Sequence, residues 1–206
     1  MAYPPGSSTD ALLILEGVLQ PGEVLYLPPF WFHHVEALDF SVSVSTVSQS
    51  EDSQAYRDAR AVPALMDSSW TLPERVYAVR LHIVAILSAL DPAAADHGAS
   101  YVREHFLESR YRLAMMDPDF ATRVTHSLGC SQSADSIPAA LQGSAVLNRV
   151  TLPKLSNFAH KVVAALSTTS DHGIRDILLD NLLEGYAHWA VGLDLLPEFW
   201  STCFGV

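Results

Sequence analysis

Two adjacent histidines, His33 and His34, and the nearby Glu36 are the residues at the start of this chain best suited to metal chemistry. Imidazole and carboxylate groups are common ligands of transition metals. His34 and Glu36 also form an HxE string, which would place both side chains on one face of a strand. We discount this pair as metal ligands, because no later histidine is placed to complete the set. Only 32 residues precede His33, and none of them is histidine.

The remaining titratable residues give weaker indications of a site. His82 and His105 lie within apolar stretches of helical spacing, and we expect both to be hydrogen-bonded residues of the core or its boundary. The two cysteines, Cys130 and Cys203, show neither a CxxC motif nor zinc-site spacing and can form at most one disulfide. This cysteine content favours a reducing, intracellular setting, cytoplasmic or nuclear.

The elements around His33 are predicted to be a turn and two strands. Pro21 and Gly22 suit the two central positions of a type II turn. The apolar run from Val24 to Leu27 then predicts a short strand, which two prolines end. Beyond the histidines, residues 39–47 alternate apolar and hydroxyl side chains, which predicts a second strand.

At these residues the chain resembles the cupin-like JmjC family of Fe(II)- and 2-oxoglutarate-dependent oxygenases, especially its asparaginyl-hydroxylase-like branch. The resemblance rests on PGEVLYLP and on WFHHVE, and it covers roughly residues 12–50. It implies that His33 is the last member of a His, Asp/Glu, His iron triad. It also implies that Ser45, where the branch often has asparagine, supports the cofactor site.

The rest of the family's cofactor site is not found in this sequence. The resemblance calls for an HxD or HxE pair on an earlier strand and for a lysine or arginine that holds 2-oxoglutarate, but the first basic residue is Arg57. Two interpretations stay open: the chain is the C-terminal portion of a protein hydroxylase, or it is a non-catalytic, cupin-derived module for dimerisation or partner binding. A cupin that binds a small molecule without redox chemistry is less favoured, because the visible strands are too short to enclose a ligand.

Beyond residue 50 the hydrophobic period changes from two to about 3.6, which predicts helices. Thr71 and Glu74 form a capping box before a helix that runs to Leu90. Further helices are predicted over 94–116, 157–166 and 171–193. The expected fold is therefore α+β: a partial double-stranded β-helix of the cupin or jelly-roll type at residues 1–50, followed by an α-helical region at residues 51–206.

Composition restricts the classes of partner. The formal charge is −11, with only 12 lysines and arginines in 206 residues, which opposes binding of nucleic acid through a broad basic surface. The longest apolar stretch, Val76 to Leu90, contains Arg80 and His82 and is too short to cross a bilayer, so we expect no membrane segment. A basic protein substrate fits the charge. The resemblance also suggests a homodimer through the C-terminal helices, where the sequence reads GLDLLPEFW.

Overall fold

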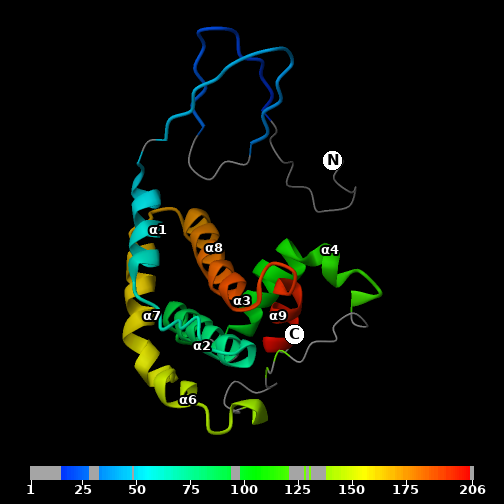
Figure 1. Cartoon of the computed structure of the whole chain (residues 1–206). Helices are drawn as coiled ribbons and strands as arrows, with labels where there is room; N and C mark the ends of the chain where they lie inside the picture. Colours follow the sequence, from blue (N-terminus) through cyan, green and yellow to red (C-terminus); the bar gives the residue numbers. More distant parts are fainter. Residues whose placement is uncertain are drawn as a thin grey trace. The chain divides into compact units, whose positions relative to one another are not determined.

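A computed structural model describes residues 15–27, 33–47, 49–93, 98–120, 128, 130 and 138–204. The chain divides into two compact units, Met1–Phe40 and Ser41–Val206. All the helices among the described residues lie in the second unit (Figure 1). In chain order they are α1 Glu51–Ala61, α2 Leu72–Leu90, α3 Ala99–Val102, η1 Arg103–Arg110, α4 Arg112–Met115, η2 Ala139–Leu141, α6 Val146–Arg149, α7 Leu152–Leu166, α8 His172–Val191 and α9 Leu196–Cys203.

The predicted turn near the start of the chain is confirmed. The amide of Glu23 donates to the carbonyl of Gln20 at 3.0 Å, and Gly22 has a φ of 89°. A positive φ at the third turn residue is the signature of a type II turn, and glycine adopts it without steric cost. Local sequence is therefore sufficient to form this turn.

The predicted β-structure is wrong for the residues that the structure describes. Neither Val24–Leu27 nor residues 39–47 form a strand, so the expected α+β fold with a partial double-stranded β-helix gives way to helical structure alone in the described part of the chain. Val24, Phe40 and Val44 are 92%, 100% and 93% exposed. An alternating pattern forms a strand only when another strand supplies hydrogen bonds and an apolar layer covers one face, and these residues have neither.

The central helix of the second unit is α2, and its predicted limits are confirmed. The Glu74 carboxylate accepts a hydrogen bond from the Thr71 amide at 2.8 Å, which completes the predicted capping interaction. Every residue from Ala78 to Leu87 is buried, so α2 is covered on all sides. Helices α7 and α8 both pack against α2, and α1 packs against α7 (Figure 1).

The other long helices also follow local signals. Helix α8 begins after Asp171, whose carboxylate accepts hydrogen bonds from the amides of Gly173 and Ile174 at 2.7 and 3.2 Å, as expected of an N-cap. Helix α7 starts at Leu152, five residues before its predicted start. Helix α1 was not predicted, although Ser50 caps it by accepting from the Ser53 amide at 3.1 Å.

The helix predicted over 94–116 is interrupted in the structure. Within its described part, α3 continues into the π-helical segment η1, which is followed by the single turn α4. The amide of Tyr111 donates to the carbonyl of Phe106, five residues earlier, at 2.7 Å. This wider turn places one extra residue in the helix and redirects the side chains that follow.

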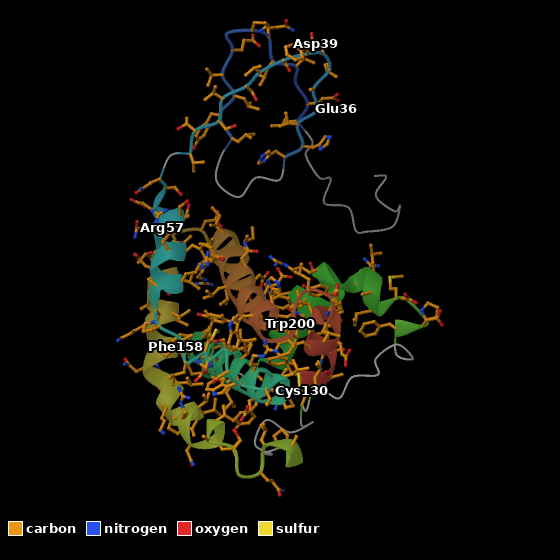
Figure 2. The ribbon with its side chains drawn as sticks, in the orientation of Figure 1. Glu36, Asp39, Arg57, Cys130, Phe158 and Trp200 are labelled. Atoms are coloured by element: carbon orange, nitrogen blue, oxygen red, sulfur yellow. A yellow bond between two sulfur atoms is a disulfide. The ribbon has the colours of Figure 1, made fainter. Side chains whose placement is uncertain are left out.

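A second part of the core lies where η1 meets α9. The ring of Trp200, which is labelled in Figure 2, lies in this part of the core. It stacks on Phe106 with centroids 4.0 Å apart, and Phe199 meets it edge to face at 5.1 Å. All three side chains are fully buried. A disulfide joins Cys203 of α9 to Cys130, with their Cα atoms 5.0 Å apart. Aromatic stacking and a covalent link thus hold the end of the chain against earlier segments.

Candidate functional site

The two site residues predicted from the sequence lie in different units. His33 belongs to the unit that ends at Phe40, and Ser45 belongs to the unit that begins at Ser41. Both side chains are exposed, as are those of His34 and Glu36. The aromatic residues immediately before His33 lie outside the described residues.

A complete iron site is not formed by the residues that the structure describes. Among them, no group of three or more histidine, cysteine, aspartate or glutamate side chains is arranged to hold a metal ion. An iron site of the facial-triad type needs three such ligands on one face. His33 therefore does not acquire, within the described residues, the two further ligands that iron would require.

A part-buried polar cluster between α8 and the continuous segment of α3 and η1 was not predicted as a unit. The Tyr101 hydroxyl donates to Asp180 at 2.8 Å, and Nδ1 of His105 lies 3.2 Å from both oxygens of the same carboxylate. The rings of Tyr101 and His105 stack with centroids 3.9 Å apart. Burial raises the pKa of the Asp180 carboxyl, although both partners act to lower it. Asp180 is therefore the residue that joins the Tyr101 hydroxyl and the His105 imidazole into one cluster.

Further polar contacts extend this cluster along the same two helices. Arg110 pairs with Glu184 and also donates to the amide oxygen of Asn181 at 2.8 Å. The Tyr111 hydroxyl donates to Glu184, and burial raises the pKa of that hydroxyl. The contacts join residues more than 70 positions apart in the chain. Their evident effect is to fix the π-helical segment against α8.

His82 is the buried core histidine that the sequence predicted, and its hydrogen bonds are satisfied. Its Nδ1 donates to the carbonyl of Ala78 at 2.7 Å, and its Nε2 accepts from the amide of Leu65 at 3.2 Å. This pair of partners requires the neutral ring with its proton on Nδ1. Burial lowers the pKa of the imidazole, so the ring stays uncharged near neutral pH.

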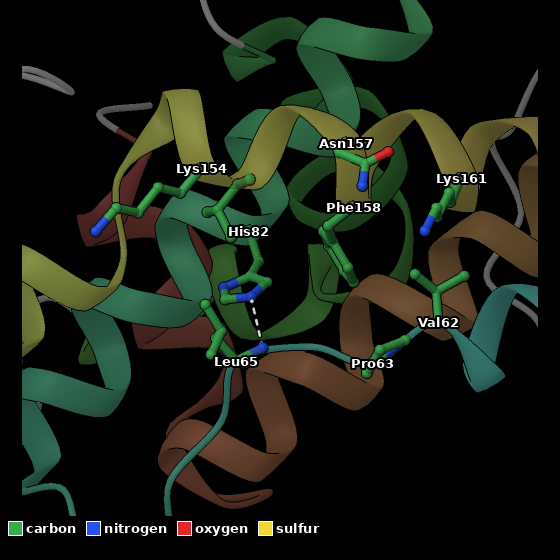
Figure 3. Close-up of a pocket in the computed structure, with 9 residues that line it drawn as sticks. Val62, Pro63, Leu65, His82, Lys154, Asn157, Phe158 and Lys161 are labelled. Atoms are coloured by element: carbon green, nitrogen blue, oxygen red, sulfur yellow. Dashed lines mark hydrogen bonds between the residues drawn. The ribbon is translucent and has the colours of Figure 1, made fainter.

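A pocket of about 170 Å³ lies beside His82, between α7 and the segment that joins α1 to α2. Its apolar surface includes Leu155 and Phe158, and the polar residues along α7 are Lys154, Asn157 and Lys161. Figure 3 shows His82 and Phe158 between the two lysines, with the Leu65 amide bonded to the imidazole. The pocket therefore combines an apolar wall with basic and amide groups.

The residues of this cluster that were not predicted carried a partial signal in the sequence. Asp180 interrupts the apolar run of α8, and a charged residue in such a run usually has a partner. The sequence did not indicate that its partners would be Tyr101 and His105, which lie 79 and 75 positions away. The sequence contained no signal for the pocket, because the residues that line it come from three separate segments of the chain.

Comparison with known proteins supports the resemblance at a coarse level. Residues 7–47 match the family model of the cupin-like domain, and this stretch contains PGEVLYLP, WFHHVE and His33. No curated protein and no solved structure matches the chain significantly. No helix in the described part of the chain is long and apolar enough to span a membrane. Residues 7–47 are therefore similar to a cupin-like domain of the JmjC type.

Proposed function

We propose that this chain is the C-terminal portion of an Fe(II)- and 2-oxoglutarate-dependent oxygenase of the JmjC type, which hydroxylates a protein side chain. The match of residues 7–47 to the cupin-like domain carries this proposal, because that stretch includes the histidine-bearing motif. Within that family we propose the asparaginyl-hydroxylase-like branch, whose motif PGEVLYLP and WFHHVE resemble. The net charge of −11 favours a basic substrate protein in an intracellular setting.

In this proposal His33 supplies the last iron ligand, and Ser45 supports the site for 2-oxoglutarate. Both side chains are exposed. Since the described residues form no three-ligand group, the remaining ligands and the basic anchor for 2-oxoglutarate must be supplied from elsewhere. One imidazole alone gives little affinity for iron, so the 206-residue chain by itself should bind Fe(II) only weakly.

The proposal is tested on the protein encoded by the complete transcript, with the 206-residue chain measured beside it. The transcript is expected to encode an HxD or HxE pair upstream and in frame. Fe(II) and 2-oxoglutarate are added anaerobically, oxygen is admitted, and succinate is measured by mass spectrometry. We expect succinate formation by the longer protein and its loss in the His33→Ala variant.

The His34→Ala variant is the matched control, because it removes an adjacent imidazole that the proposal does not place on iron. Succinate formation that survives in His33→Ala would overturn the assignment of His33. A transcript with no upstream HxD or HxE pair, together with a folded protein that forms no succinate, would overturn the oxygenase proposal.

The second candidate is a non-catalytic, cupin-derived module for dimerisation or partner binding. It is favoured by the exposure of the apolar side chains Phe40, Val42 and Val44, which a second chain would remove from water. The apolar residues of α9, including Phe199 and Trp200, are buried within the chain itself. Light scattering during size-exclusion chromatography tests the dimerisation role. A dimer that the Phe40→Ser and Val44→Ser substitutions together convert to a monomer supports this role, and a monomer at all concentrations contradicts it.

A further inference from the structure

The two lysines of the whole sequence, Lys154 and Lys161, both line the pocket beside His82. The chain has 23 acidic residues, yet none of them is among the nine residues that line this pocket. Helix α7, which carries both lysines, contains neither aspartate nor glutamate. An acidic protein thus has a local basic region over this pocket, which favours an anionic occupant.

The apolar part of the pocket sets the size of that occupant. Its volume is about 170 Å³, and a dry protein cavity of roughly 150 Å³ is known to accommodate benzene. Phe158 and Leu155 are 8% and 1% exposed, so they form a fixed wall. His82 belongs to the same wall, and both of its ring nitrogens already have backbone partners. The wall therefore suits a ring or a short branched chain.

The polar groups along α7 set the charge and orientation of the occupant. Asn157 and Lys161 are four residues apart, so their side chains lie on the same face of the helix. Neither makes a hydrogen bond or ion pair with any residue that the structure describes. Lys154 is different, because its ammonium group already donates to the carbonyl of Asn148. Asn157 and Lys161 thus offer two adjacent donors to one carboxylate.

We propose that this pocket binds a small monocarboxylate with an apolar body about the size of benzene. The body would pack against Phe158 and Leu155, and the carboxylate would accept hydrogen bonds from Lys161 and Asn157. Figure 3 shows Phe158, Asn157 and Lys161 at the pocket. The pocket lies wholly within the helical unit, so this proposal does not depend on the iron chemistry proposed above.

Benzoate is the test probe, and benzamide is its uncharged counterpart of nearly the same shape. Both are titrated into the 206-residue chain at pH 7 while amide resonances are followed by two-dimensional NMR. For a ligand of this size we expect saturation with a dissociation constant of about 1 mM. The shifted resonances should lie on α7 and on residues 62–65, and benzamide should bind about tenfold more weakly.

Two variants then distinguish binding of benzoate at Lys161 from a general attraction of the anion to positive charge on the protein. Lys161→Met preserves helix propensity and the aliphatic stem, and it should weaken benzoate binding about tenfold. Arg103→Met is the matched control, because it removes one positive charge from an exposed residue that does not line the pocket. Circular dichroism establishes that both variants are folded. Benzoate shifts that do not saturate, equal affinity for benzamide, or unchanged affinity in Lys161→Met would each overturn the proposal.

Discussion

Reduction of the Cys130–Cys203 disulfide should lower the stability of the helical unit substantially. The two cysteines are 73 positions apart, so the bond closes a loop of more than 70 residues in the unfolded chain. In the chain-entropy description a loop of this length stabilises the folded state by about 4 kcal/mol relative to the open chain. That is a large fraction of the roughly 5–15 kcal/mol by which domains are usually stable.

The measurement is urea unfolding of the oxidised chain and of the same chain after reduction, followed by circular dichroism. This comparison leaves every side chain except the disulfide unchanged. The Cys130→Ser variant is the control: it should resemble the reduced chain, and reductant should not change its midpoint. Cys130 is the better position for substitution because Cys203 is fully buried, where a hydroxyl would add a separate cost.

Two outcomes would refute this reasoning. A thiol assay that finds two free cysteines in the unfolded, unreduced protein would show that the bond does not form. Equal unfolding free energies for the oxidised and reduced chains would show that the bond forms without restricting the unfolded state. The expectation of a reducing setting, drawn from the small number of cysteines, makes this experiment informative about where the protein works.

Two further predictions concern the core. Burial lowers the pKa of His82 from 6.5, so below pH 6.5 the unfolded chain binds a proton that the folded chain does not. The free energy of unfolding should therefore fall by up to about 1.4 kcal/mol per pH unit as the pH is lowered. Urea midpoints measured between pH 7.5 and 5.5 should depend less on pH in the His82→Gln variant than in the unmodified chain. An unchanged pH dependence in that variant would contradict the assignment. The Trp200→Ala substitution should lower the free energy of unfolding by about 3–5 kcal/mol, because it removes a fully buried ring that stacks on Phe106. The control Leu193→Ala, at an exposed position, should change the free energy of unfolding little. Similar losses in both variants would contradict the described packing.

Local sequence correctly predicted three features that depend on residues two to four positions apart. The turn at Gly22, the capping interaction of Thr71 with Glu74 and the N-cap at Asp171 all satisfy backbone groups within a few residues. Helix α1 had a similar signal in Ser50 and the acidic residues after it, but its polar composition led to its interpretation as a connector. The partners in these interactions are close in the chain, which is why their sequence patterns are informative.

Strands and sites required information that the sequence alone does not contain. The alternation around Phe40 predicts a strand only if partner strands are present, and no such partner lies among the described residues. The π-helical turn before Tyr111, the contacts of Asp180 with Tyr101, and the disulfide each depend on segments brought together by packing. The pocket beside His82 likewise exists only once three segments meet. The motif around His33 thus came from the sequence, whereas the tertiary structure decided which polar groups became neighbours, because such contacts form only when the chain folds.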